Sequence, residues 1–97
     1  MHIAIQRDGD SLSVQPEGRL DTSTSPQLQD ALVLDGVAHL VFDFSRLEYL
    51  SSAGLRVLIT AQKAMNAASG TMEIRGANGT VRNVFDITGC SGIFTVV

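Results

Sequence analysis

One apolar run in the middle of the chain, residues 40–42, strongly limits what this sequence can fold into. A strand with one wet face alternates apolar and polar side chains, whereas this run places Leu, Val and Phe in succession. Such runs are typical of a central strand in a parallel sheet whose two faces are both covered. Parallel strands need crossover connections, so helices are expected before and after this strand.

Alternating side chains predict two more strands at the start of the chain. Residues 3–5 and residues 12–14 alternate apolar with polar side chains, and residues 8–10 between them supply a turn. Together they predict a hairpin at the edge of the sheet. Pro16 has no backbone N–H, so it is expected to mark the point where ladder hydrogen bonds are no longer required.

Three helices are predicted between the strands. Their starts are marked by the hydroxyl-rich segment before Pro26, by residues 51–53, and by Asn78 as an N-cap. Two further short strands are predicted at residues 72–74 and at residues 93–97.

The resulting order of elements is β-β-α-β-α-β-α-β, with a loop through Tyr49 after the central strand. This order predicts an α/β fold with a mostly parallel mixed sheet, an antiparallel N-terminal edge strand and about three helices. A single domain is expected over residues 1–97.

Charge and cysteine content argue against several classes of function. Seven basic and ten acidic residues give a formal net charge of −3 without any block of like charges, so no nucleic-acid footprint or basic membrane patch is expected. The single cysteine, Cys90, cannot form an internal disulfide, and no Cys/His cluster has metal-ligand spacing. With no secretion signal and no membrane-spanning run expected, a cytoplasmic location is the prediction.

Small hydroxyl residues and two carboxylates are predicted to gather at one edge of the sheet. In open sheets of this kind, ligands and partners meet the carboxyl ends of the strands and the loops that follow them. Residues 21–25, 43–45 and 50–55 all fall at that edge, and they include Asp21 and Asp43. This cluster is the most informative feature of the sequence for function.

A catalytic interpretation of this cluster has little support. A serine nucleophile needs a base within hydrogen-bond reach, but His39 starts the central strand, about 20 Å from Ser45 at ~3.3 Å per residue. Geometry does not exclude His2 as the base, although a chain terminus is a poor place for an orienting base. Asp21 and Asp43 have the chemistry to hold a cation, but such carboxylates more often bond their own loops. No catalytic residue, metal or cofactor is therefore predicted.

A regulatory interpretation centres on Ser52, at or just inside a helix N-terminus, where unpaired N–H groups and the helix dipole favour negative charge. A phosphoryl group on Ser52 would add a charge of about −1.5 to −2 beside Asp21 and Asp43. Gly54, in the first turn, would expose backbone and leave space for a close approach. The alternative is that Ser51 and Ser52 are simply helix caps, and the residues alone leave both interpretations open.

Two segments resemble the STAS domains, and more narrowly the bacterial anti-sigma factor antagonists. The first is residues 40–45 followed by residues 49–58, with Ser52 two positions before a Gly-Leu pair, and the second is residues 18–21, which read Gly-Arg-Leu-Asp. The predicted order of strands and helices is similar to that family over nearly the whole chain. The resemblance therefore implies a STAS fold.

The same resemblance implies a partner-switching role. In that family an unphosphorylated antagonist binds an anti-sigma factor that is also an ATP-dependent serine kinase, and a sigma factor is released. Phosphorylation of the motif serine breaks the complex, and a serine phosphatase restores it. Carried onto this chain, the phosphoacceptor is Ser52. The residues expected to contact the partner are Asp21, Ser23, Asp43, Ser45, Ser51, Ser52, Ala53, Gly54, Arg56 and Val57.

Two features depart from the family pattern. Many relatives have an acidic residue where Ser51 stands, which makes Ser51 a competing phosphoacceptor. Many also carry a further helix after the last strand, where this chain ends at Val97. The alternative function is a non-sigma scaffold subunit that docks a transporter or lipid-transport ATPase through the same face without phosphorylation. A third class is an independent hydrolase or metal enzyme.

Overall fold

The structure, a computed structural model, describes the whole chain, Met1–Val97. Six strands and three helices follow one another with a short 3-10 turn near the end. Their bounds are β1 His2–Asp8, β2 Ser11–Leu20, α1 Ser25–Ala31, β3 His39–Asp43, β4 Leu47–Leu50, α2 Ser52–Ala67, β5 Thr71–Arg75, α3 Gly79–Thr88, η1 Cys90–Gly92 and β6 Thr95–Val96. None of the helices has the length and hydrophobicity needed to cross a membrane.

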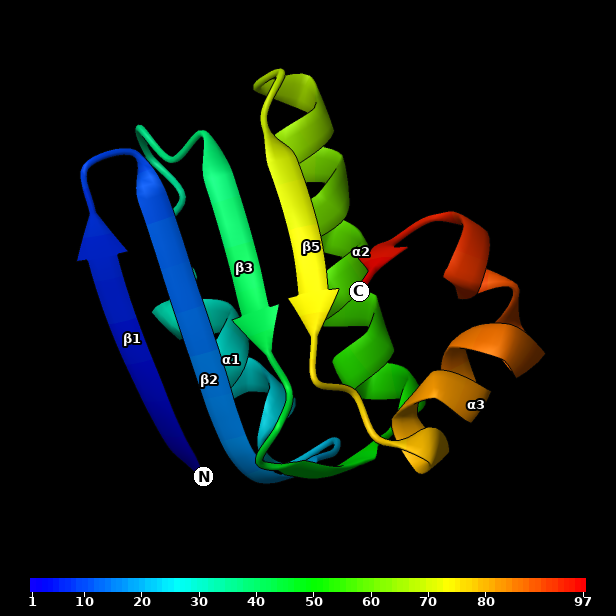
Figure 1. The fold of residues 1–97 in the computed structure, drawn as a ribbon. Coiled ribbons are helices and arrows are strands. Elements are labelled where there is room, and N and C mark those ends of the chain that lie inside the picture. Colours follow the sequence, from blue (N-terminus) through cyan, green and yellow to red (C-terminus); the bar gives the residue numbers. More distant parts are fainter.

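The sheet is mixed and mostly parallel (Figure 1). Its strands lie in the order β1-β2-β3-β5-β6, and β4 pairs with β2 outside this path. Only the β1–β2 pair is antiparallel, while the β2–β3, β2–β4, β3–β5 and β5–β6 pairs are all parallel. The predicted α/β fold class is therefore confirmed, including the antiparallel strand at the N-terminal edge.

Strand β2 is longer than the sequence predicts and changes partners along its length. Residues 11–14 pair with β3, and residues 18–20 pair with β4. Pro16 lies in the interval between these two ladders. Neither β3 nor β4 needs an N–H donor from β2 at this position, so a proline can stand there. The prediction that pairing ends near Pro16 is therefore wrong, because the strand continues past the proline to a new partner.

Strand β4 was predicted to be a loop, and this prediction is also wrong. Leu47 and Leu50 are both buried, and the half-exposed Tyr49 and exposed Glu48 lie between them. Because the two leucines are three residues apart, they cannot point to the same face of a strand. The segment therefore lacks the two-residue period by which a half-buried strand is detected in a sequence.

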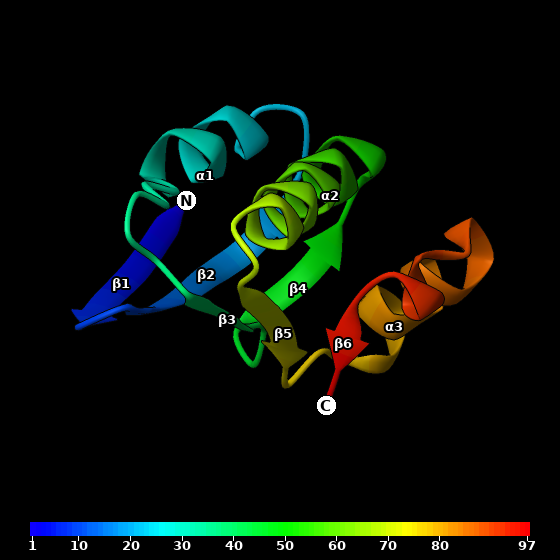
Figure 2. The same ribbon diagram turned by 90° about the horizontal axis from the view of Figure 1, so that it is seen from above.

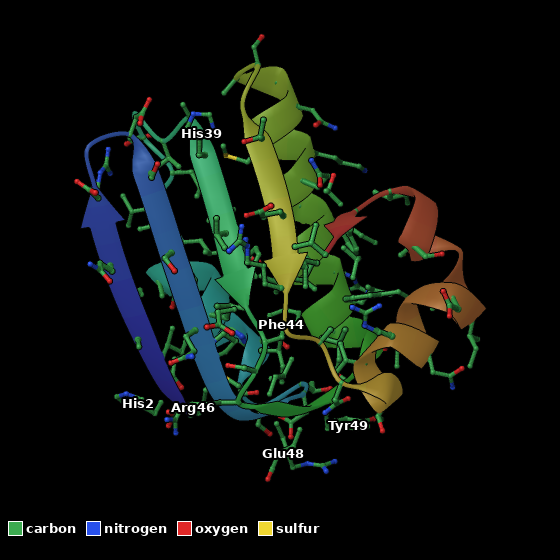
Figure 3. The ribbon with its side chains drawn as sticks, in the orientation of Figure 1. His2, His39, Phe44, Arg46, Glu48 and Tyr49 are labelled. Carbon is green, nitrogen blue, oxygen red and sulfur yellow. The ribbon has the colours of Figure 1, made fainter.

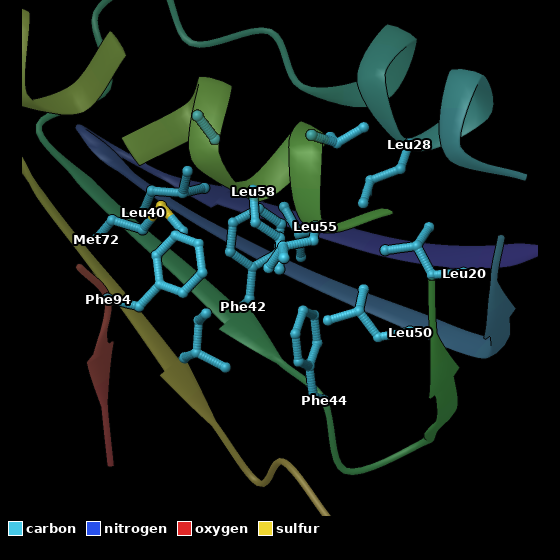
Figure 4. Close-up of a cluster of buried hydrophobic side chains, with 14 of the residues drawn as sticks. Leu20, Leu28, Leu40, Phe42, Phe44, Leu50, Leu55, Leu58, Met72 and Phe94 are labelled. Carbon is cyan, nitrogen blue, oxygen red and sulfur yellow. The ribbon is translucent and has the colours of Figure 1, made fainter. Parts of the chain in front are cut away.

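Helices α1 and α2 cover one face of the sheet, and α3 lies to the side, near β6 (Figure 2). The largest buried side chains gather under α2, among them Leu40 and Phe42 of β3 and Leu58 of the helix (Figure 4). Helix α3 joins the same hydrophobic cluster, with the rings of Phe85 and Phe94 5.4 Å apart and edge-to-face.

The opposite face of the sheet carries no helix at β3. Val41 alternates with the buried Leu40 and Phe42, is only half-buried, and pairs with Ser13 on one side and Glu73 on the other. The expectation that the apolar run is covered on both faces is therefore wrong. A single valine among polar neighbours extends the run without needing a second layer.

This difference between the two faces predicts how substitutions in β3 affect stability. Phe42→Ala should lower the free energy of unfolding by about 3–5 kcal/mol, because a fully buried ring is lost. Val41→Ala on the open face should cost about 1 kcal/mol or less. Urea unfolding followed by circular dichroism measures both values, and equal losses would contradict a one-sided core.

Candidate functional site

The two serines at the start of α2 have different roles. Ser51 is the N-cap: its Oγ accepts a hydrogen bond from the N–H of Gly54 at 3.3 Å, and its own N–H donates to the Leu20 carbonyl at 2.9 Å. Ser52 is the first residue of the helix, is exposed, and uses its hydroxyl in no hydrogen bond of the structure. The Ser51 hydroxyl is therefore committed to capping, whereas the Ser52 hydroxyl is available.

Gly54 is buried, and it brings α2 against the ends of two strands. A Cβ at this position would lie 2.7 Å from Cγ of Leu20 and 2.8 Å from Cδ1 of Leu50. Both leucines are fully buried. The close approach that the glycine permits is thus the approach of the helix to its own sheet, so Gly54 does not lie on an exposed docking surface as the sequence suggested.

Asp21 organises the turn between β2 and α1. Its Oδ1 accepts hydrogen bonds from the N–H of Ser23 at 2.9 Å and of Thr24 at 3.1 Å. The Thr24 N–H holds the pKa of Asp21 below its ordinary value, helped by the Ser23 N–H and the Thr24 hydroxyl, although partial burial opposes them. Because Asp21 follows Leu20, whose carbonyl binds Ser51, the turn lies beside the start of α2.

A groove of about 390 Å³ lies between α1 and α2, next to Ser52. Its floor on the α2 side includes Ala53 and Val57, and Arg56 and Thr60 line it from the same helix. The other wall is formed by Thr22, Ser25, Pro26, Gln29 and Asp30. Thr22 and Ser25 belong to the segment 21–25 that the sequence placed at this edge. Pro26, Gln29 and Asp30 of α1 were not predicted, because the polar side of a short helix looks the same in a sequence whether or not it borders a groove.

Asp43 and Ser45 belong to a different surface. Asp43 alternates with the buried Phe42 and points to the open face of the sheet, where its Oδ2 accepts from Nε2 of Gln15 at 3.0 Å. Its Oδ1 accepts from the N–H of Ser45 at 3.0 Å, and this bond is the main cause that lowers the pKa of Asp43. Asp43 lines a hollow with Gln15 and residues of β1, not the groove beside Ser52.

The structure thus brings together only part of the predicted site. Asp21, Ser51 and Ser52 meet where β2 ends and α2 begins, and Ala53, Arg56 and Val57 follow along the groove. Ser23 is exposed in the turn that Asp21 closes. No hydrogen bond or shared hollow joins Asp43 or Ser45 to this group.

Aromatic and histidine side chains near the strand ends complete the site's surroundings. The Arg19 guanidinium lies 4.2 Å from the centre of the Tyr49 ring, a cation–π contact that the sequence did not indicate.

Figure 3 shows His39 at the end of the sheet opposite Arg46 and Glu48, which confirms its predicted position far from Ser45. Nowhere do three His, Cys, Asp or Glu side chains lie close enough together to hold a metal ion.

The geometry and topology agree with a known family. The family model described as "Mlab, STAS domain" matches residues 3–96. This chain belongs to the STAS family.

Curated relatives support the same assignment. The STAS domain described here is 29% identical over 103 residues to the anti-sigma-B factor antagonist of Listeria monocytogenes, covering 99% of this chain and 90% of that protein. It is 34% identical over 83 residues to BtrV of Bordetella bronchiseptica, covering 82% of this chain and 72% of that protein.

Solved structures show the same fold. The anti-sigma factor antagonist SpoIIAA in its unphosphorylated form superposes with a TM-score of 0.86 at 18% identity, covering 99% of this chain and 88% of that one. The Bacillus SpoIIAA in its phosphorylated form gives a TM-score of 0.77 at 18% identity, with coverage of 99% and 91%. At this identity the likeness concerns the fold alone.

The packing of Gly54 in this STAS domain predicts an unusual response to alanine. Alanine is normally the better helix former, but Gly54→Ala should lower stability by about 1–3 kcal/mol, because its Cβ meets Leu20 and Leu50. Gly79→Ala, at the first position of α3, is the matched control, since nothing lies within 4 Å of the added Cβ. Thermal unfolding compares the two variants, and equal melting temperatures would contradict the packing described.

The lowered pKa values of Asp21 and Asp43 predict a dependence of stability on pH. A carboxyl whose pKa is lower in the folded state stabilises the fold above the ordinary aspartate value of 3.8. This stabilisation is lost as the pH falls through the lower, folded-state value. The Asp21→Asn variant should therefore lose less stability than the wild type when the pH is lowered. Urea titrations at several pH values measure the free energy of unfolding of both proteins. The same dependence on pH in both would show that the turn does not stabilise the carboxylate.

Proposed function

We propose that this STAS domain is an anti-sigma factor antagonist whose unphosphorylated form binds an anti-sigma factor that is also an ATP-dependent serine kinase, thereby releasing a sigma factor. Phosphorylation of Ser52 ends this binding, and a serine phosphatase restores it. The observation that carries the proposal is the exposed, unused Ser52 hydroxyl at the start of α2, beside a serine that already serves as the cap.

The names of relatives support the sigma-factor part of this proposal. The Listeria relative is named an anti-sigma-B factor antagonist, and SpoIIAA is titled an anti-sigma factor antagonist. SpoIIAA has also been solved in a phosphorylated form, so a domain of this fold accommodates a phosphoryl group. The relatives are named as regulators, and we extend this to the present chain as a protein without catalytic activity of its own, acting in the cytoplasm.

The local structure explains how a phosphoryl group on Ser52 would act. A helix N-terminus presents N–H groups and the positive end of the dipole, so an added charge of about −1.5 to −2 is tolerated by the fold. The groove next to it is bordered by the carboxylate of Asp30 and by the guanidinium of Arg56, one turn after Ser52. The phosphoryl group therefore changes the charge and shape of the surface where a partner would dock, while α2 stays in place.

The docking surface in this proposal follows the start of α2 and the groove. Ala53 and Val57 supply an apolar floor, and Arg56 and Ser23 supply polar contacts at its margin. Asp21 holds the turn that forms one end of this surface. A partner would have to extend around the strand ends to reach Asp43 and Ser45 as well.

A second candidate is a scaffold subunit that docks a transporter or lipid-transport ATPase through the same groove without phosphorylation. The matching family model is described as "Mlab, STAS domain" and does not name an anti-sigma factor antagonist, so it is compatible with a role outside sigma-factor control. Affinity purification from the native cell separates the two functions. Recovery of a kinase-like anti-sigma factor supports the first, and recovery of a transporter ATPase alone supports the second.

Kinase labelling tests the assignment of Ser52. Incubation with the cognate anti-sigma kinase and radiolabelled ATP should label the wild type and leave Ser52→Ala unlabelled, because the acceptor hydroxyl is gone. Ser51→Ala is the matched control: it should still be labelled, although losing the cap should cost about 1 kcal/mol of stability. Labelling of Ser52→Ala at the wild-type level would exclude this serine as the acceptor.

Charge at position 52 should be sufficient to prevent binding. Ser52→Asp is expected to keep the wild-type circular dichroism spectrum and melting temperature, because a carboxylate suits a helix start. Its affinity for the unmodified kinase should nevertheless fall at least tenfold in isothermal titration calorimetry, whereas Ser52→Asn, which is similar in size but neutral, should bind more tightly than Ser52→Asp. Unchanged affinity of Ser52→Asp would contradict an electrostatic switch.

A further inference from the structure

Strand β1 leaves a long, unprotected edge of the sheet (Figure 1). It pairs with β2 on one side and with nothing on the other, over all seven of its residues. Natural proteins protect such edges with proline, lysine, bulges or very short strands, and β1 has none of these. The guanidinium of its one arginine, Arg7, is held back by the carbonyls of Gly9 at 3.2 Å and Asp35 at 3.0 Å.

The register of β2 determines which backbone groups β1 directs outward. In β2 and the turn before it, the even-numbered residues direct their backbone N–H and C=O groups toward the side of β3 and β4. The Asp10 carbonyl accepts from the N–H of His39, and the Gly18 N–H donates to the Arg46 carbonyl. Odd-numbered residues of β2 therefore bond to β1, where their partners are the even-numbered residues 2–8. The N–H and C=O groups of Ile3, Ile5 and Arg7 must then point to the open edge.

The sequence of β1 is complementary to itself when two copies run antiparallel with Ile5 opposite Ile5. Ile3 then faces Arg7 of the other copy, so three successive pairs exchange main-chain hydrogen bonds. His2 faces Asp8 at both ends, and an imidazole N–H can donate to that carboxylate. Ile5, one of the few large apolar side chains that are strongly exposed, at 46%, is covered by its counterpart.

Other arrangements of the same edge are less favourable. A parallel pairing would set Asp8 against Asp8 of the other copy, and like charges directly opposite destabilise a sheet. An antiparallel pairing centred on Arg7 would bring two guanidinium-bearing side chains face to face, and one centred on Ile3 would pair fewer residues. Among the antiparallel registers, only the one centred on Ile5 pairs all seven residues of the strand.

We propose that β1 pairs with β1 of a second copy of this chain, forming a twofold-symmetric dimer with one continuous sheet. This goes beyond the proposed function and does not depend on it. Strand β4 leads into Ser52, and β2 lies between β4 and β1. A second copy bound at β1 therefore leaves the start of α2 uncovered.

Cysteine cross-linking tests the register directly. In the proposed pair the two Ile5 Cα atoms lie about 5.5 Å apart, within the range of a disulfide, whereas the two Ala4 Cα atoms are diagonal neighbours at about 7–8 Å. Ile5→Cys should therefore form a covalent dimer under mild oxidation, and Ala4→Cys should not. The native Cys90 is buried and does not compete. Equal cross-linking of the two variants, or none in Ile5→Cys, overturns the proposal.

Sedimentation equilibrium tests the dimer without cross-links. The wild type should shift from one to two chain masses with rising concentration, and Ile5→Pro should stay at one, since it removes an outward N–H and no bond to β2. Ile5→Thr, which keeps that N–H, is the control and should still dimerise.

A wild type that remains monomeric up to millimolar concentration overturns the proposal, as does an Ile5→Pro variant that is folded by circular dichroism and still dimeric. Should Ile5→Pro fail to fold, an exchange of the two residues that face each other at the ends of the pair decides the matter. His2→Asp and Asp8→His should each associate more weakly than the wild type alone and recover when mixed, because only the mixed dimer has unlike partners at both ends.

Discussion

The structure depends on one strand that changes partners half-way along its length. Strand β2 binds β3 with its first residues and β4 with its last, and Pro16 stands between the two ladders. Because β4 runs beside the second half of β2, its end brings Ser51 to the Leu20 carbonyl. The start of α2 is thus fixed by the backbone of β2 and not by loop contacts alone. For this reason the short strand β4 and the N-cap Ser51 hold Ser52 in a defined position.

The same strand determines the character of the opposite edge. The backbone groups of the even-numbered residues of β2 point toward β3 and β4. Those of its odd-numbered residues therefore form a regular antiparallel ladder with β1. The outer side of β1 consequently carries an unbroken row of N–H and C=O groups. One strand therefore generates two different surfaces, a side-chain surface at the start of α2 and a main-chain edge at β1. Because they lie on different sides of β2, occupation of one need not block the other.

The sequence predicted the features that depend on local chemistry and missed those that depend on tertiary partners. The N-cap at Asn78 is present, because a side-chain cap requires one of a few residue types. Strand β4 was missed because its two buried leucines are three residues apart and so do not follow the two-residue period of a half-buried strand. The roles of Gly54 and Asp43 were also not predictable, since no sequence pattern tells which neighbour a buried glycine meets or toward which face a strand-end carboxylate points.

The carboxylates of the two strand ends limit how charge can act at Ser52. Asp21 accepts hydrogen bonds from its own turn, and Asp43 is held by Ser45 and Gln15 on the other face of the sheet. Their charges are present in both states of Ser52, so they cannot by themselves distinguish one state from the other. The difference between the states must come from the phosphoryl group itself. At physiological ionic strength an exposed charge acts over about 8 Å. A partner that responds to phosphorylation must therefore dock within this distance of Ser52, at the first turn of α2 and the end of the groove next to it.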